Sequence, residues 1–262
     1  MKRIAALTIT LTLLQLLALG GCKTVARALN NSGTLFLVDL VPDEKHAAAD
    51  IADRSVKVLR SRLNAIGIDG EVKYTGGNRL EVKIYGAPDL VRVRDFLFKT
   101  YKLEFRKVVS PPSPHPVEMF PDEEKAKASA VAGQQVLPYS EREDASRPQY
   151  LILESDPIVT GEYIRSADAV SRSGSDHDYQ IGFSLNSEGA NKLGDWTAKN
   201  INNYLAVVLD GKVESVAFIR SQISDSGEIS GMFSKAEAEE IARVLGSGYM
   251  PWKLRVVEER KF

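Results

Sequence analysis

The chain has 262 residues, of which 44% are hydrophobic and 26% are charged, and its formal net charge at pH 7 is −1. These proportions are ordinary for a globular protein, and the length allows one large domain or two small ones. Lys and Arg are interspersed with Asp and Glu. The charge therefore gives no drive toward nucleic acid or an anionic surface, and we expect no nucleic-acid partner.

The N-terminus has the pattern of an export signal. Lys2-Arg3 precedes an apolar stretch from Ile4 to Leu19, which is shorter than the roughly 20 residues that a transmembrane helix needs. Leu19-Gly20-Gly21-Cys22 then resembles a bacterial lipobox. This resemblance implies cleavage between Gly21 and Cys22 and acylation of Cys22, for example with palmitate. We expect a lipoprotein signal peptide over residues 1–21 and a tether over residues 22–32.

Cys22 is the only cysteine of the chain. One unpaired thiol is unusual in an exported protein, and lipidation would account for it. Two alternatives stay open: an uncleaved signal anchor, or an ordinary secretory signal with Cys22 inside the mature protein. Under the lipoprotein interpretation, the lipid bilayer is a partner through acylated Cys22. The protein would then be extracytoplasmic, facing the periplasm from the outer or inner membrane.

A strand and a helix open the part of the chain expected to fold. The strand is predicted from Gly33 to Leu40. One helix face is indicated by apolar residues at three- and four-residue steps, namely Ala52, Val56, Leu59, Leu63 and Ile66. Gly67 is expected to end this helix as a C-cap.

A hairpin, a second helix and a closing strand follow. The hairpin is predicted to turn at Gly76-Gly77-Asn78, and the helix to start near Pro88-Asp89. In the closing strand, Leu103 and Phe105 alternate with charged residues. The order β-α-β-β-α-β is that of a ferredoxin-like sandwich, which we predict over residues 33–108 as a base domain. Residues 109–148 are rich in proline and charge, and we expect a linker there.

Residues 149–262 are predicted to form a second α/β two-layer unit, so the fold class is α+β with mainly antiparallel sheets. Its centre is the Asp210-Gly211 dipeptide between two apolar runs, which is a strong signal for a hairpin with a type I′ turn. The preceding run, Tyr204–Leu209, is apolar on both faces, so we expect a central strand covered on each side. Asn186 or Ser187 would cap one helix. Ser234-Lys235-Ala236-Glu237 forms a capping box for another.

No catalytic constellation is visible in the sequence. The three histidines, His46, His115 and His177, lack partners at zinc-ligand spacing, and there is no Gly-x-Ser-x-Gly elbow. Glu258 and Glu259 are adjacent on a predicted strand, so they would point to opposite faces. We therefore expect a protein that is not an enzyme, with no catalytic residues, cofactor or metal.

Two long stretches of the chain together form a recognisable pattern. The first runs from Val58 to Gly67 and on to Leu103-Glu104-Phe105-Arg106, and the second from Val159 to Arg260. They resemble the first periplasmic domain of SecD and SecDF, accessory subunits of bacterial protein export. The motif positions in this sequence, expected to be structural, are Arg60, Arg62, Gly67, Arg106, Gly161, Gly189, Asp210, Gly211, Gly231, Glu258, Glu259 and Arg260. The resemblance implies that the first stretch is a base and that the second is a head contacting emerging polypeptide.

The resemblance also sets limits. SecD chains continue into transmembrane helices that carry proton-coupling charges, whereas this sequence stops at Phe262. We therefore expect no proton-coupled motor activity. The preferred hypothesis is a membrane-tethered module that binds unfolded polypeptide, or a Sec or envelope protein complex, through features such as open sheet edges. The alternative is a structural or assembly envelope lipoprotein with no role in translocation.

Overall fold

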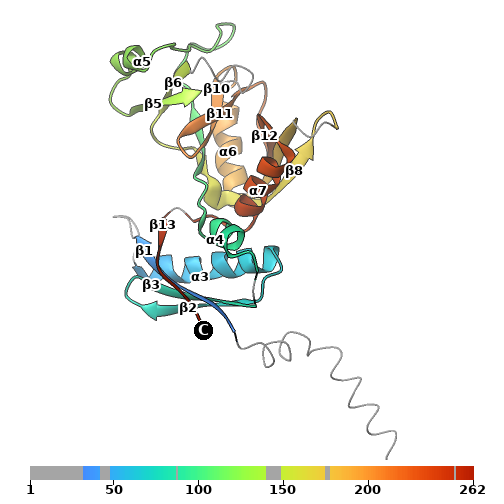
Figure 1. The fold of residues 1–262 in the computed structure, drawn as a ribbon. Coiled ribbons are helices and arrows are strands. Elements are labelled where there is room, and N and C mark those ends of the chain that lie inside the picture. Colours follow the sequence, from blue (N-terminus) through green and yellow to red (C-terminus); the bar gives the residue numbers. More distant parts are fainter. Residues whose placement is uncertain (1–31, 42–47, 87, 140–148, 175–177, 251) are drawn as a thin grey trace, which may run out of the picture. The chain divides into compact units, whose positions relative to one another are not determined.

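The computed structural model describes residues 32–41, 48–86, 88–139, 149–174, 178–250 and 252–262 (Figure 1). Its contacts divide the chain into two units. The base unit contains the residues up to Phe98 together with Leu254–Phe262, and the head unit is Lys99–Lys253. In the part of the chain that is described, no helix is long and apolar enough to cross a bilayer.

The base unit is a ferredoxin-like sandwich. Its elements are β1 (Gly33–Val41), α3 (Ala48–Ala65), β2 (Gly70–Gly76), β3 (Arg79–Tyr85), α4 (Leu90–Phe98) and β13 (Lys253–Lys261). The sheet order is β13-β1-β3-β2. This places β1 and β3 at the centre, as the split βαβ pattern requires.

The helix-facing side of this sheet holds the core of the base unit. Along β1, Phe36 and Val38 are fully buried, and Leu59 of α3 and Leu97 of α4 are fully buried as well. The Phe36 ring meets Phe98 of α4 edge-on, with centroids 5.7 Å apart. Burial of each such side chain stabilises the fold by about 1.5–3 kcal/mol. The positions of β1 and of the helix α3 thus agree with the sequence prediction.

The prediction that Leu103–Arg106 closes the sheet of the base unit was wrong. The structure places this segment, β4 (Leu103–Lys107), in the head unit, where it pairs with β10 (Tyr204–Leu209). The fourth strand of the base is instead β13, and Phe262, directly after it, exchanges two backbone hydrogen bonds of 3.1 Å with Gly33. The base therefore does not run through residue 108, and the head unit is inserted between α4 and β13.

In its described residues, the head unit contains two sheets and three α-helices. Its strands are β4, β5 (Gln134–Tyr139), β6 (Gln149–Glu154), β7 (Val159–Thr160), β8 (Ile164–Ser171), β9 (Tyr179–Leu185), β10, β11 (Lys212–Phe218) and β12 (Ser226–Phe233). They form sheets of order β6-β5-β11-β10-β4-β7 and β12-β9-β8. Pairing is antiparallel except between β11 and β5, which confirms the mainly antiparallel α+β class.

The helices of the head unit are α5 (Glu123–Ser129), α6 (Ser187–Lys199) and α7 (Lys235–Gly246), with a 3₁₀ turn η2 (Gly161–Tyr163). Asn186 caps α6 by accepting from the Gly189 N–H at 2.9 Å. Ser234 and Glu237 form the predicted capping box of α7. Local signals therefore set the start of both long helices, because each cap needs only residues within one turn.

Part of the predicted linker is ordered structure. Asp122 caps α5, and β5 pairs with β6 along its whole length. Phe120 also forms a bridge with Tyr150. The prediction of a linker from composition was wrong for these residues. The apolar residues of β5 find partners only through strand pairing with a later part of the chain. The segment 140–148 of the predicted linker lies outside the described residues.

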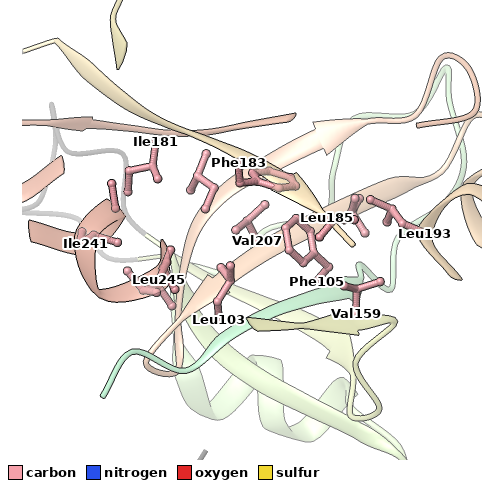
Figure 2. Packing of buried hydrophobic residues seen from close by; sticks show 14 of the residues in the cluster. Leu103, Phe105, Val159, Ile181, Phe183, Leu185, Leu193, Val207, Ile241 and Leu245 are labelled. Atoms are coloured by element: carbon pink, nitrogen blue, oxygen red, sulfur yellow. The ribbon is translucent and has the colours of Figure 1, made fainter. Parts of the chain in front are cut away.

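The central strand of the head is β10, as predicted. Leu205 to Leu209 are each at most 7% exposed. Leu205, Val207 and Leu209 join one core with β4, β9, α6 and α7, whereas Ala206 and Val208 join a second core with Val108 and three leucines of β5 and β6. Figure 2 shows the first core, where the rings of Phe105 and Phe183 lie with centroids 5.2 Å apart. Burial on both faces explains the uninterrupted apolar run.

Candidate interaction surfaces

The predicted lipidation site, Gly21-Cys22, lies outside the described residues. Of the motif positions, Arg60, Arg62 and Gly67 belong to α3 and its C-terminal end in the base unit. Gly67 has a φ of +67° and donates to the Asn64 carbonyl at 3.0 Å, so it ends the helix as expected.

The two arginines of α3 differ in burial. Arg62 is 1% exposed, and its Nη1 donates to the Leu97 carbonyl at 2.6 Å and to the Phe96 carbonyl at 3.4 Å. It thereby satisfies carbonyls at the C-terminus of α4, where the helix dipole favours a cation. Burial lowers the pKa of Arg62 to about 10, so it remains charged at neutral pH. Arg60 lies on the exposed side and donates to the Val72 carbonyl of β2 at 2.9 Å.

Arg106 forms a buried ion pair within the head unit. Its Nη2 lies 2.7 Å from Oε2 of Glu104, and both residues are 5% exposed. Arg106 Nη1 donates to Oε1 of Gln135, on β5, at 2.7 Å. Both charged side chains lie on the face of β4 opposite Leu103 and Phe105, and the structure buries this face as well as the apolar one.

The Asp210-Gly211 turn joins β10 to β11 as predicted. Asp210 has a φ of +51° and Gly211 a φ of +82°, as a type I′ turn requires. The Asp210 carboxylate accepts from the Lys102 N–H at 2.7 Å, and its own N–H donates to the Lys102 carbonyl at 3.0 Å. The turn therefore also fixes the chain just before β4.

Three motif glycines of the head lie against aromatic side chains. A Cβ at Gly161 would lie 2.7 Å from Cδ2 of Tyr249, and one at Gly189 would lie 2.5 Å from Cβ of Tyr163. A Cβ at Gly231 would lie 2.6 Å from the Phe233 ring. These distances are far shorter than van der Waals contact, so the absence of a side chain at these glycines allows the aromatic residues to pack closely.

The C-terminal motif residues lie on β13 of the base unit and are exposed. Glu258 pairs with Arg260 at 3.3 Å, whereas Glu259 lies 3.7 Å from Arg94 of α4. The two adjacent carboxylates thus have different partners and do not form a pair. The motif residues as a whole are divided between the two units rather than gathered at one site.

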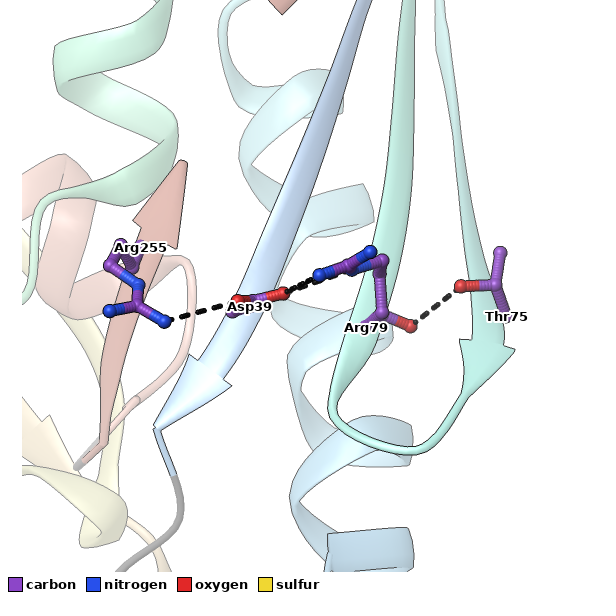
Figure 3. A network of polar contacts seen from close by, with 4 residues as sticks. All are labelled: Asp39, Thr75, Arg79 and Arg255. Atoms are coloured by element: carbon purple, nitrogen blue, oxygen red, sulfur yellow. Dashed lines mark hydrogen bonds and ion pairs between the residues drawn. The ribbon is translucent and has the colours of Figure 1, made fainter. Parts of the chain in front are cut away.

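A polar cluster at one end of the base sheet was missed by the sequence analysis (Figure 3). Asp39 of β1 accepts from Arg79 Nε and Nη2 at 3.0 and 2.9 Å, and from Arg255 Nη2 of β13 at 3.2 Å. The two hydrogen bonds from Arg79, and then the one from Arg255, lower the pKa of the Asp39 carboxyl. An acidic residue inside an apolar strand was the available signal, but the identity of its partners depends on strand register.

Two shallow cavities accompany these features. One of about 550 Å³ is lined by the Asp39 cluster and the β2–β3 turn of the base unit. The other, of about 500 Å³, lies between β8 and α7 of the head unit. Among the described residues, no group of three or more His, Cys, Asp or Glu side chains could hold a metal ion.

Comparison with known proteins matches this architecture. Residues 134–252 match the family model of the SecDF P1 head subdomain. The protein translocase subunit SecD of Aquifex aeolicus is 29% identical over 214 residues, and that of Koribacter versatilis is 30% identical over 226 residues. Each alignment covers 80% of this chain and 39% of the relative. The chain thus spans about two fifths of the length of the curated relatives it matches.

Solved structures agree with the sequence matches. A structure of the membrane component SecDF that enhances protein export superposes with a TM-score of 0.63 at 26% identity, covering 86% of this chain and 99% of that one. SecDF in its super-membrane-facing form also gives a TM-score of 0.63 at 26% identity, covering 87% of this chain and 30% of that one.

The fold and these surfaces define a two-unit α+β domain in which a head is inserted into a ferredoxin-like base. In sequence and fold, this domain is similar to the periplasmic domain of SecD and SecDF, and residues 134–252 match the model of the P1 head subdomain.

Proposed function

We propose that this protein is a membrane-tethered extracytoplasmic lipoprotein whose SecD-type domain binds polypeptide, or an envelope protein complex, in relation to protein export. The observation that carries the proposal is the head unit, since its sequence and fold match the P1 head of proteins named for translocation and export. We assign no proton-coupled motor activity and no catalytic step to this domain.

The membrane tether is proposed from the Leu19-Gly20-Gly21-Cys22 motif. In cells supplied with an alkyne analogue of palmitate, the protein should acquire the label and partition with membranes. Cys22→Ser should lose the label, because the thiol that accepts the acyl chain is absent. Equal labelling of the native protein and this variant would contradict lipidation at Cys22.

Polypeptide binding can be tested by photo-crosslinking in cells. A photoreactive residue at Ser173, beside the β8–β9 hairpin, or at Lys212, beside the Asp210-Gly211 turn, should capture many exported proteins during their export. A matched probe at Lys57, on the exposed side of α3 in the base unit, serves as the control. Capture of one fixed envelope protein at unit stoichiometry would instead favour the structural role, with no part in translocation.

A further inference from the structure

The three-stranded sheet of the head unit ends in an open strand. Its order is β12-β9-β8, so β8 pairs with β9 on one side and with no strand among the described residues on the other. An edge strand of this kind presents backbone N–H and C=O groups that can pair with another chain. The relevant part of this edge is formed by residues 167–171 of β8.

The register shows which backbone groups face outward. Arg172 N–H donates to the Asp178 carbonyl at 3.0 Å, so Arg172 and Asp178 form a hydrogen-bonded pair. Because such pairs alternate in an antiparallel ladder, Val170 and Asp168 also bond to β9. Ala167, Ala169 and Ser171 therefore direct their N–H and C=O groups away from β9.

Helix α7 forms the second wall of a groove along this edge. Lys235, Glu239 and Ala242 are spaced by one or two helical turns and line a cavity of about 500 Å³ together with Ala167, Ala169 and Tyr179. At one end, a Cβ on Gly246 would lie 3.5 Å from the Ala167 N and 3.6 Å from its O, so the helix closes the groove there. The edge at Ala169 and Ser171 lies in the open part.

We propose that this groove binds a short extended polypeptide segment, which adds to β8 as a fourth strand and packs its side chains against α7. The occupant follows from the two walls, since outward N–H and C=O groups in alternation can pair with the backbone of an extended segment. The lining also carries both signs of charge, from Asp168 and Glu239 and from Lys235 and Arg243. Recognition would therefore depend on the backbone of the bound segment rather than on the charge of its side chains. This inference rests on the proposed polypeptide binding and gives it a site.

The test uses Ala169→Pro in the full-length protein. Proline removes an N–H that the β8–β9 ladder does not use and projects its ring into the groove, so the sheet should persist. Binding of a short fluorescein-labelled peptide of alternating valine and serine, measured by fluorescence anisotropy, should weaken by at least about tenfold. The same peptide with N-methyl groups on alternate residues should bind the native protein equally poorly.

The matched control is Tyr74→Pro, which makes the same change at an outward-facing position of the edge strand β2 in the base unit. This variant should bind the labelled peptide as the native protein does. If the native protein binds the peptide and Ala169→Pro or N-methylation leaves the affinity unchanged, the groove is not the site, although polypeptide binding stands. If the native protein binds no extended peptide at all, the proposed function fails as well.

Discussion

At the scale of single residues, the motif positions act through burial and backbone geometry. Arg62 satisfies the C-terminal carbonyls of α4, and Arg106 neutralises Glu104 inside the head unit. Removing one partner of a buried ion pair leaves an uncompensated charge, which typically costs about 3–5 kcal/mol. Exposed pairs such as Lys192–Glu188 on α6 contribute far less. The motif residues of this protein therefore contribute mainly to packing within each unit.

The arginines of α3 allow this conclusion to be tested. Arg62→Ala should destabilise the base unit by about 3 kcal/mol, because it leaves a cavity and unpaired carbonyls at the end of α4. Arg60→Ala, which removes an exposed donor to Val72, should cost about 1 kcal/mol or less. Hydrogen exchange of the α3 and α4 amides would measure both changes. Equal costs for the two variants would show that burial does not decide the contribution.

At the scale of elements, the docking of β13 completes the base sheet. Gly33 pairs with Phe262 at one end, and the Asp39 carboxylate holds Arg255 and Arg79 at the other. The charged, alternating sequence of β13 suits an edge strand, because one row of its side chains stays in water. The polar cluster thus connects three neighbouring strands, β13, β1 and β3, at one end of the sheet.

The Asp39 cluster predicts a dependence of stability on pH. The folded pKa of Asp39 lies below its ordinary value of 3.8, so the carboxylate stabilises the base unit above that pH. This contribution should be lost as pH falls through the lowered pKa. Asp39→Asn should therefore cost about 1 kcal/mol at pH 7, after allowance for solvent screening, and progressively less below pH 3.8.

Denaturant unfolding followed by hydrogen exchange of β1 and β13 would measure this dependence between pH 7 and pH 3. Asp53→Asn, at an exposed position of α3 in the same unit, is the matched control and should change little at either pH. A constant difference between the native protein and Asp39→Asn across this range would contradict the assignment.

At the scale of the whole molecule, the head unit is an insertion in the base. Residues Lys99–Lys253 have their own two cores, whereas the base needs both ends of the described chain. A domain with its own core can fold alone. Without β13, the base would expose the edge of β1 and keep a sheet of only three strands.

This arrangement predicts that Lys99–Lys253, produced alone, folds with the same tryptophan fluorescence and a cooperative thermal transition. Residues 32–98 alone should not fold stably, because β1 lacks its partner strand. Joining Leu254–Phe262 to Phe98 through a short glycine-serine linker should restore the base, as judged by far-UV circular dichroism. A stable fold of residues 32–98 by themselves would contradict the role given to β13.

The sequence by itself determined the local elements. The positive φ values of Asp210 and Gly211, the C-cap at Gly67 and the capping box at Ser234 each depend on residues within one turn, so their patterns could be read directly. The apolar run of β10 likewise predicted burial on both faces. The family resemblance followed from the same residues and was confirmed.

Only the tertiary structure decided which strand completes which sheet. In β4 and in the first part of β13, charged residues alternate with apolar ones, so either strand could extend the sheet beside β1 by pattern alone. The choice depends on contacts far apart in sequence, such as Arg106 with Gln135 and Asp39 with Arg255. Strand pairing is set by backbone hydrogen bonds that every residue can make, so a local pattern specifies a strand but not its neighbour.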